Sequence, residues 1–313
     1  MEFGGSFFGC DAAAGIRTWP DPEWTIADLV AAKNGRTISV VLPALNEEET
    51  VGSVVASIRP LLGTLVDELV VMDSGSTDRT IEVAAAAGAT VVTRESVLPD
   101  ISPVPGKGEV LWRSLAWVTG DIVAYVDSDL IDPDPAFVPG LVGPILLGEG
   151  VELCKAYYRR PFRSGAMVDE NGGGRVTELV ARPLLAALRP ELRSVIQPLG
   201  GECAATREAL SAVEFAPAYG VEIGLLIDIF DRYGANAIAQ VNLGLRQHRN
   251  RPLAELGVMS RQIMATAFRR CGLPDSGAAL LQFAADADGF VARESAVQTA
   301  DRPRMQSLLK AAI

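Results

Sequence analysis

Basic and aromatic residues are scarce in this chain of 313 residues, and histidine occurs only once. Lys and Arg together number 28 against 39 Asp and Glu, which gives a formal net charge of −11, and aromatic residues make up 6%. This acidic balance argues against a nucleic-acid-binding protein with a broad basic surface. An anionic ligand must therefore be held by a local cluster of basic groups or by a metal ion.

Long apolar runs and closely spaced cysteine pairs are also missing. No apolar run approaches the ~18 residues of a membrane span, and residues 1–10 contain no Lys or Arg. We therefore expect neither a membrane segment nor an export signal. The four cysteines lie far apart and form no C-x-x-C pair, which argues against a zinc ribbon or a small disulfide scaffold. These features favour a protein of the reducing cytoplasm.

The chain does contain a regular alternation of strand and helix patterns. After an irregular arm, the first half predicts strands at 37–42, 68–72, 90–93 and 122–126, and helices at 49–62, 78–87 and 108–118. The second half is less periodic and predicts strands at 151–158 and 237–243, and helices at 176–188, 221–233, 259–269 and 278–285. Such alternation is typical of an α/β fold with an open, mostly parallel, Rossmann-like sheet that carries helices on both faces.

Two aspartates, Asp127 and Asp129, follow the fourth predicted strand and flank Ser128. Ligands of open α/β sheets gather beyond the carboxyl ends of the strands, so this turn is a favoured place for a site. Two carboxylates in one turn suit Mg²⁺ or Mn²⁺ bridging a diphosphate, because these cations prefer oxygen ligands. The tripeptide also occurs in ordinary turns, and only its position after a strand favours the metal interpretation.

The loops after the first and second predicted strands carry small and polar residues. The first loop allows two interpretations. Either residues 43–47 surround a nucleobase with backbone groups while Glu47 accepts hydrogen bonds from ribose hydroxyls, or Asn46 only caps a helix. In the second loop, Asp73 or Ser74 binds the uracil or the ribose, or the segment is only a tight turn before the next helix.

Three further segments carry basic residues in unusual settings. Lys107 lies between two glycines that let the backbone approach a ligand, so it is either a phosphate or base contact or a solvated lysine. His248 lies in the polar stretch 246–251, where it is either a third metal ligand, with the arginines reaching phosphates, or a surface residue. The glycines before Arg175 and Thr177 form a second phosphate site or a flexible linker. Lys155, Arg159 and Arg160 are interpreted as a solvated strand end.

Three motifs, in this order, resemble the nucleotide-binding half of GT-A glycosyltransferases: 40–48 (VVLPALNEE), 70–80 (VVMDSGSTDRT) and 127–129 (DSD). Over about residues 15–300, and with the further motifs 174–177 (GRVT), 198–202 (PLGGE) and 248–251 (HRNR), the chain is similar to one retaining group of that family. Members of this group move glucose from UDP-glucose to the 2-hydroxyl of 3-phospho-D-glycerate and so begin methylglucose lipopolysaccharide synthesis. The resemblance implies a GT-A fold, a divalent metal (Mg²⁺ or Mn²⁺) and a homodimer without nucleic-acid or membrane partners.

The resemblance also assigns roles to individual positions. Residues that hold UDP-glucose are Pro43, Ala44, Leu45, Glu47, Ser74, Lys107 and Ser128. Asp129 and His248 ligate the metal with Asp127 alongside. The phosphoglycerate site comprises Gly174, Arg175, Thr177, Tyr219, Asn250 and Arg251. The catalytic set is Asp127, Asp129, Glu222 and Leu199, in which Glu222 is expected to bind glucose hydroxyls and the Leu199 carbonyl to stabilise a front-face reaction.

This interpretation divides the chain into four segments: an N-terminal arm (1–36), a nucleotide-sugar-binding half (37–150), an acceptor-binding half (151–252) and a helical C-terminal extension (253–313) that contacts a second subunit. The nearest alternative is an inverting GT-A transferase in which Glu222 is the general base for another small acceptor. A sugar-nucleotide pyrophosphorylase would carry a Gly-rich Arg and Lys signature after the first strand, where this chain has residues 43–47. A non-catalytic module would bind UDP-glucose without turnover.

Overall fold

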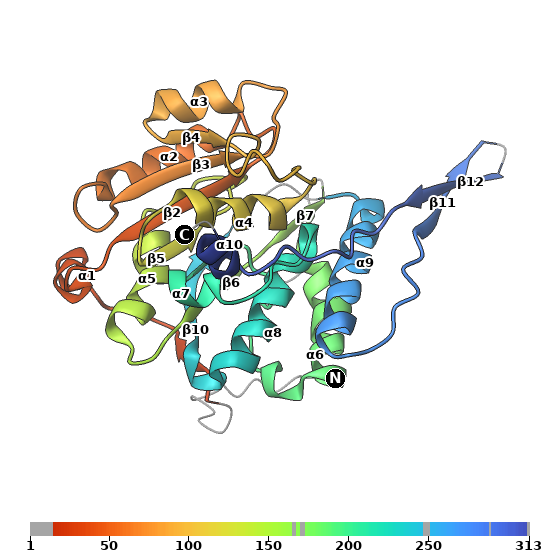
Figure 1. The fold of residues 1–313 in the computed structure, drawn as a ribbon. Coiled ribbons are helices and arrows are strands. Elements are labelled where there is room, and N and C mark those ends of the chain that lie inside the picture. Colours follow the sequence, from red (N-terminus) through yellow and green to blue (C-terminus); the bar gives the residue numbers. More distant parts are fainter. Residues whose placement is uncertain (1–14, 165–166, 170–172, 247–250, 288, 312–313) are drawn as a thin grey trace.

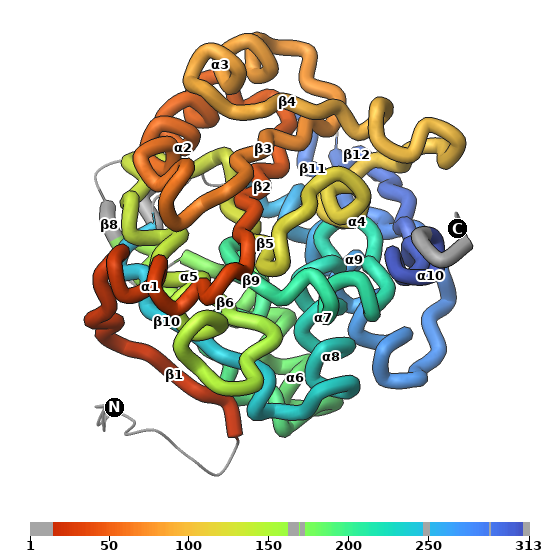
Figure 2. The backbone as a smooth tube through the Cα atoms, turned by 60° about the vertical axis from the view of Figure 1, so that its left-hand side comes forward, coloured from red at the N-terminus to blue at the C-terminus, as the bar shows by residue number. Residues whose placement is uncertain are grey.

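An eight-stranded sheet forms the centre of the molecule in a computed structural model that describes residues 15–164, 167–169, 173–246, 251–287 and 289–311 (Figure 1). The strands follow the order β1 (Arg17–Trp19), β10 (Ile238–Leu245), β6 (Leu153–Arg159), β9 (Cys203–Thr206), β5 (Ile122–Tyr125), β2 (Ile38–Ala44), β3 (Glu68–Asp73) and β4 (Thr90–Thr93). Figure 2 shows β1 and β4 at opposite edges of this sheet.

Every strand of this sheet except β9 runs in the same direction. β9 pairs antiparallel with both β5 and β6, whereas the other neighbouring strands pair in parallel. The carboxyl ends of β2, β3 and β5 therefore lie together at one end of the sheet, which is where such sheets bind ligands. The mostly parallel sheet predicted from the sequence is confirmed.

Helices cover both faces of the sheet. The α-helices are α1 (Ile26–Lys33), α2 (Val51–Ile58), α3 (Thr80–Ala87), α4 (Lys107–Trp117), α5 (Phe137–Leu147), α6 (Arg182–Leu188), α7 (Arg207–Ser211), α8 (Val221–Tyr233), α9 (Leu253–Arg270) and α10 (Met305–Ala311). Single helical turns occur at Arg59–Leu61, Thr177–Ala181, Pro190–Leu192, Ala218–Gly220 and Ala235–Ala237. Two small hairpins, β7 (Phe162–Ser164) with β8 (Met167–Asp169) and β11 (Leu280–Asp286) with β12 (Gly289–Ser295), lie outside the main sheet.

The apolar run of β2 explains the two-sided packing. Val40 and Leu42 belong to the core that contains α2 and α5, whereas Val41 belongs to the core on the other face with α4 and α8. Side chains alternate between the two faces of a strand, so a strand covered on both faces must be apolar at successive positions. The continuous run that predicted a buried strand thus also predicted helices on both sides.

Most predicted elements are confirmed with shifts of a few residues, but the predicted helix at 278–285 is wrong. This segment forms β11, which pairs antiparallel with β12 in a hairpin that projects from the body (Figure 1). Its apolar residues alternate with polar or small ones, as Leu281, Gln282 and Phe283 do, which is the period of a strand. The predictions also missed α1, α5, β1 and the antiparallel β9. Among the described residues, no helix combines the length and the apolar character needed to cross a membrane.

Candidate active site

Two adjoining cavities lie beyond the carboxyl ends of β2, β3 and β5. The empty space between their walls, with the open mouths included, is about 1010 Å³ in the first and about 830 Å³ in the second. They share a wall of five residues: Lys107, Asp127, Asp129, Tyr219 and Arg251. A ligand in the first cavity would therefore lie directly against a ligand in the second.

The first cavity brings together all the residues expected at the UDP-glucose site. Its lining consists of Pro43, Ala44, Leu45, Asn46, Glu47, Ser74, Gly106, Lys107, Val110, Asp127, Ser128, Asp129, Tyr219 and Arg251. Most of these residues come from the ends of three neighbouring strands, from the loops that follow them and from the start of α4, whereas Tyr219 lies in the turn Ala218–Gly220 and Arg251 lies just before α9. Val110 also lines this cavity, and the sequence did not single it out as a ligand contact.

Hydrogen bonds between the first two loops fix the shape of this cavity. The Asn46 side chain accepts a hydrogen bond from the Thr77 backbone N–H at 2.8 Å, and the Glu47 N–H donates to Thr80 Oγ1 at 2.7 Å. Asn46 thus joins the two loops instead of capping α2, and it adopts a left-handed conformation with φ of 56°. Asparagine tolerates this conformation better than most residues do.

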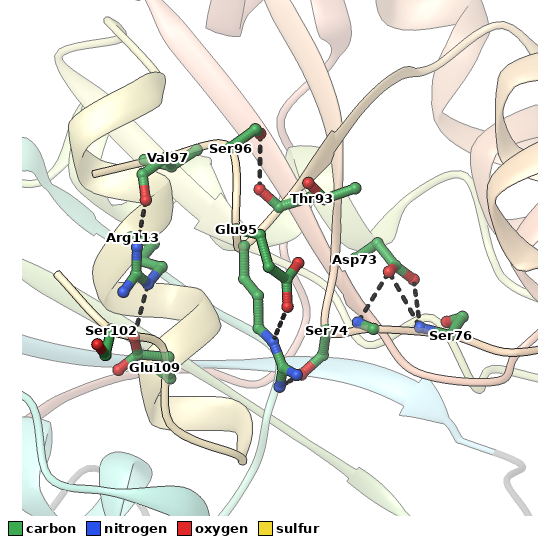
Figure 3. A network of polar contacts seen from close by, with 12 residues as sticks. Asp73, Ser74, Ser76, Thr93, Glu95, Ser96, Val97, Ser102, Glu109 and Arg113 are labelled. Atoms are coloured by element: carbon green, nitrogen blue, oxygen red, sulfur yellow. Dashed lines mark hydrogen bonds and ion pairs between the residues drawn. The ribbon is translucent and has the colours of Figure 1, made fainter. Parts of the chain in front are cut away.

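Of the two candidates in the second loop, only Ser74 lines the cavity. The Asp73 carboxylate is buried and accepts hydrogen bonds from the N–H groups of Gly75 and Ser76 at 2.8 and 3.0 Å (Figure 3). Asp73 therefore shapes the turn, whereas Ser74 presents its side chain near Arg94, whose Nη1 donates to Ser74 Oγ at 3.3 Å.

A buried arginine holds the segment that leads to Lys107. Arg113, on α4, donates to the backbone carbonyl groups of Val97 and Leu98, and its Nε contacts Glu109 Oε1 at 2.6 Å (Figure 3). Arg113 and Glu109 are fully buried. This pair ties the loop after β4 to α4, whose first residue is Lys107.

Lys107 forms the centre of a buried charge cluster. Its Nζ lies 2.5 Å from Asp127 Oδ1 and 2.9 Å from Glu222 Oε1, so one ammonium group bridges two carboxylates. Burial lowers the pKa of Lys107, but Asp127 and Glu222 outweigh this effect and hold its pKa well above the usual value. Lys107 is therefore a permanent cation and not a solvated loop lysine.

Arg246 is the second cation of the cluster. Its Nη2 lies 2.8 Å from Asp127 Oδ2 and 3.1 Å from Asp129 Oδ1, and its Nε lies 2.7 Å from Glu202 Oε1. Burial raises the pKa of Asp127, but Lys107 and Arg246 outweigh it and hold this pKa well below the usual range. For Asp129, burial raises the pKa, and the nearby carboxylates of Asp127 and Glu202 add to that rise.

The charge of the cluster suits a divalent cation. Two cations, Lys107 and Arg246, face four carboxylates, those of Asp127, Asp129, Glu202 and Glu222, which leaves a net charge of −2. Carboxylate oxygens are the ligands that Mg²⁺ and Mn²⁺ prefer. Within the described part of the chain, no three His, Cys, Asp or Glu side chains form a complete metal-ligand group. The predicted ligand His248, like the predicted acceptor contact Asn250, lies outside the described residues.

The second cavity brings together the described residues expected at the acceptor site. Its lining consists of Lys107, Asp127, Asp129, Tyr158, Arg160, Gly173, Gly174, Arg175, Val176, Thr177, Leu199, Gly201, Tyr219, Glu222, Arg246, Arg251, Leu256 and Met259. Arg175 Nη2 donates to the Arg251 carbonyl at 2.9 Å, and the Arg251 guanidinium lies 5.5 Å from the centre of the Tyr219 ring. The cavity can thus hold a small anion beside the buried carboxylates.

The structure corrects the interpretation of residues 155–160 as a solvated strand end. Lys155 is buried and its Nζ donates to the Gly200 carbonyl at 2.8 Å, and Arg160 lines the second cavity, whereas Arg159 is exposed. The reason is that β6 lies between β9 and β10 and is covered along most of its length. Arg246, expected among arginines that reach phosphates, is buried against three carboxylates.

Comparisons with known proteins identify relatives of the whole chain. The sequence model of the family described as Glycosyl transferase family 2 matches residues 39–166. Glucosyl-3-phosphoglycerate synthase of Mycolicibacterium smegmatis is 67% identical over 93% of this chain and 96% of its own. Two crystal structures of glucosyl-3-phosphoglycerate synthase from Mycobacterium tuberculosis each cover 94% of this chain and 99% of theirs with a TM-score of 0.87. One, 60% identical, contains Mg²⁺ and UDP, and the other, 61% identical, contains Mn²⁺, UDP-glucose and phosphoglyceric acid.

Proposed function

The chain belongs to the glucosyl-3-phosphoglycerate synthases, and from this premise we propose that it transfers glucose from UDP-glucose to 3-phosphoglycerate in a metal-dependent reaction. The observation that carries this proposal is the common wall of the two cavities. It supports a donor in the first cavity whose sugar reaches an acceptor in the second. We further propose that the acceptor group is the 2-hydroxyl and that the glucose keeps its α configuration.

The uridine diphosphate occupies the first cavity. Residues 43–47 and Ser74 surround the uridine, and Lys107 and Ser128 lie at the diphosphate end of the same cavity. A divalent cation held by Asp129, Asp127 and His248 would supply positive charge to the diphosphate as it departs. Lys107 supports the same end of the donor because its ammonium group is permanently charged.

The acceptor occupies the second cavity, where Arg175 and Thr177 bind its phosphate or carboxylate. Arg175 is oriented by its hydrogen bond to the Arg251 carbonyl, and Thr177 begins a helical turn three positions after the glycine at 174. Guanidinium groups and exposed backbone N–H groups are suited to anions. The excess of positive side chains in the lining of the second cavity is a local feature, because the chain as a whole is acidic.

Glu222 binds the glucose hydroxyls in this proposal. One of its carboxylate oxygens is already 2.9 Å from Lys107 Nζ, and the residue lies in the first turn of α8 with little exposure. An anchored carboxylate can accept hydrogen bonds from a sugar without moving. The acceptor hydroxyl then enters on the face that the diphosphate leaves: its oxygen bonds to the anomeric carbon as the bond to the diphosphate breaks, and its proton passes to the departing phosphate oxygen. The Leu199 carbonyl, in the lining of the second cavity, stabilises the developing charge on the sugar.

The inverting alternative uses the same carboxylate as a general base. It would give a β-glucoside, so the anomeric configuration of the product separates the two mechanisms. We favour retention because the Glu222 carboxylate is paired with the ammonium group of Lys107. A carboxylate held in this way serves better to bind sugar hydroxyls than to remove a proton as a mobile base.

We also propose that two copies of the chain associate, and the projecting hairpin supports this. On one of its faces β11 presents Leu281 and Phe283, and β12 presents Phe290, with exposed fractions of 53%, 63% and 78%. An isolated two-stranded hairpin is marginally stable in water, so this apolar face favours a partner. Cytoplasmic location and a place at the start of methylglucose lipopolysaccharide synthesis stay predictions from the family resemblance.

The proposed acceptor is tested with two isomers. With UDP-glucose and MgCl₂, the purified protein should convert 3-phosphoglycerate into a product one hexose heavier by mass spectrometry. The matched control is 2-phosphoglycerate, which has the same mass and charge but no free 2-hydroxyl, and it should stay unmodified. Equal glucosylation of both isomers would contradict transfer to the 2-hydroxyl, and modification of neither would contradict the acceptor assignment.

A further inference from the structure

A buried ion pair lies behind the two aspartates of the shared wall. Glu202 has no exposed surface, and it lines neither of the two cavities. Its Oε1 lies 2.7 Å from Arg246 Nε, and its Oε2 accepts a hydrogen bond of 2.5 Å from the Tyr158 hydroxyl. The Tyr158 ring also lies beneath the guanidinium of Arg246, with 5.6 Å between the Arg246 Cζ and the ring centre.

The geometry divides the hydrogen-bonding groups of Arg246 between two tasks. Its Nε points to Glu202, whereas Nη2 reaches Asp127 and Asp129 together. A guanidinium is planar and rigid, so fixing Nε and the stacked ring fixes Nη2 as well. We infer that Glu202 is a positioning residue for metal binding: it orients Arg246 and compensates its charge, so that the cluster around Asp127 and Asp129 keeps the net negative charge that attracts a divalent cation.

Charge balance explains why this compensation matters. Without Glu202, the positive charge of Arg246 would be paired with the aspartates alone. The net charge of the cluster would then change from −2 to −1. The aspartates would then attract a dication less strongly, because the interaction of buried charges is poorly screened. Residues that hold metal ligands in place without touching the metal commonly have such effects.

The inference rests on the proposed function and is tested by binding as well as by turnover. Binding of Mn²⁺ in the presence of UDP is followed by electron paramagnetic resonance for the wild type and for Glu202→Gln, which keeps the size of the side chain. We expect the Mn²⁺ dissociation constant of the variant to rise about 10- to 100-fold.

A matched control separates this role from loss of a buried ion pair as such. Asp228→Asn removes another carboxylate paired with an arginine, Arg270, and should leave Mn²⁺ binding within about twofold of the wild type. The double variant Glu202→Gln with Arg246→Gln removes both charges and should bind Mn²⁺ more tightly than Glu202→Gln alone.

Two results would overturn the inference: wild-type Mn²⁺ affinity in folded Glu202→Gln, or an equal loss of affinity in Asp228→Asn. If Glu202→Gln does not fold, Glu202→Asp keeps the charge and should retain Mn²⁺ binding, and weak binding by this folded variant would also overturn it. A wild-type protein that binds Mn²⁺ but transfers no glucose to 3-phosphoglycerate would contradict the proposed function and leave the binding comparison intact.

Discussion

The ammonium group of Lys107 and the carboxylate of Asp127 lie 2.5 Å apart on the wall that the two cavities share. Lys107 comes from the start of α4 and Asp127 from the loop after β5, so this contact joins the donor side to the predicted metal ligands. Breaking a buried ion pair by changing one partner typically costs about 3–5 kcal/mol. Any residue that packs against this pair therefore controls the geometry of both cavities.

Gly201 packs against this pair, and Gly201→Ala should disable the site. An added Cβ would lie 2.3 Å from Asp127 Oδ2 and 2.5 Å from Lys107 Nζ, so the ends of both side chains would have to shift from their present positions. A displacement of about 1 Å in a catalytic group can cost about 100-fold in rate, and we expect kcat/KM to fall by at least about that factor.

The neighbouring Gly200 provides the control for this steric argument. A Cβ at Gly200 would meet its nearest atom, the Ala156 carbonyl oxygen, at 3.2 Å, and no atom of the charge cluster lies among its nearest contacts. Gly200→Ala should therefore keep most of the activity, as measured by steady-state kinetics. Equal losses in the two variants would contradict a specific role of the space beside Lys107 and Asp127.

Arg175→Ala should weaken acceptor binding selectively. A charge-assisted hydrogen bond contributes about 1.5–3 kcal/mol, so we expect the KM for 3-phosphoglycerate to rise about 10- to 100-fold. The KM for UDP-glucose should stay the same, since Arg175 lines only the second cavity. Arg182→Ala is the control, because Arg182 is paired with Glu178 and lines neither cavity. A rise in the KM of both substrates would place Arg175 outside the acceptor site.

Asp228 should make the stability of the protein depend on pH. Burial raises the pKa of Asp228 from 3.8 to about 6. The positive charge of Arg270 opposes this rise, whereas the negative charges of Asp301 and Glu214 add to it. A carboxyl group whose pKa is higher in the folded state stabilises the fold at pH below about 4, and this contribution is lost as the pH rises through 6. The amount is on the order of 3 kcal/mol for a shift of this size.

The prediction is a difference between the wild type and Asp228→Asn in thermal melts from pH 4 to pH 7. The advantage of the wild type in Tm should be largest at pH 4 and should shrink toward pH 7, because the asparagine does not titrate. A constant difference between wild type and Asp228→Asn across this range would contradict the raised pKa.

Phe290→Glu should prevent self-association. Phe290 lies opposite Ala285 on the hairpin face that also carries Leu281 and Phe283. A buried, unpaired carboxylate at an interface is strongly unfavourable, so light scattering after size exclusion should give a dimer mass for the wild type and a monomer mass for the variant. Val291→Glu places the same charge on the opposite face of the hairpin and should remain dimeric. A monomeric wild type would contradict the proposed association.

The parts of the site that the sequence predicted are those determined by local chain structure. Residues 43–47 and 127–129 directly follow buried strands, and strand direction alone brings the ends of β2 and β5 together. The donor residues were therefore predictable from apolar runs, loop composition and the family resemblance, and all of them line one cavity.

The parts that the sequence did not predict depend on contacts between distant segments. Nothing near Glu202 in the sequence indicates that its partner is Arg246, 44 positions away, or that Tyr158 donates to it. Lys155 has the charge of a surface residue, and only the strands on both sides of β6 bury it. The segment 278–285 is rich in alanine, which favours helix, and its pairing with β12 decides the strand.

The central claim is that the chain transfers glucose from UDP-glucose to 3-phosphoglycerate with retention. Proton NMR of a mixture of protein, UDP-glucose and MgCl₂ tests it most directly, because the UDP and anomeric proton signals appear in one spectrum. The account predicts UDP release that requires 3-phosphoglycerate and is lost when EDTA removes the metal, together with the small coupling constant of an α-glucoside. UDP release at the same rate without 3-phosphoglycerate would contradict the proposed acceptor site. A β-glucoside as the product would contradict retention and favour Glu222 as the general base.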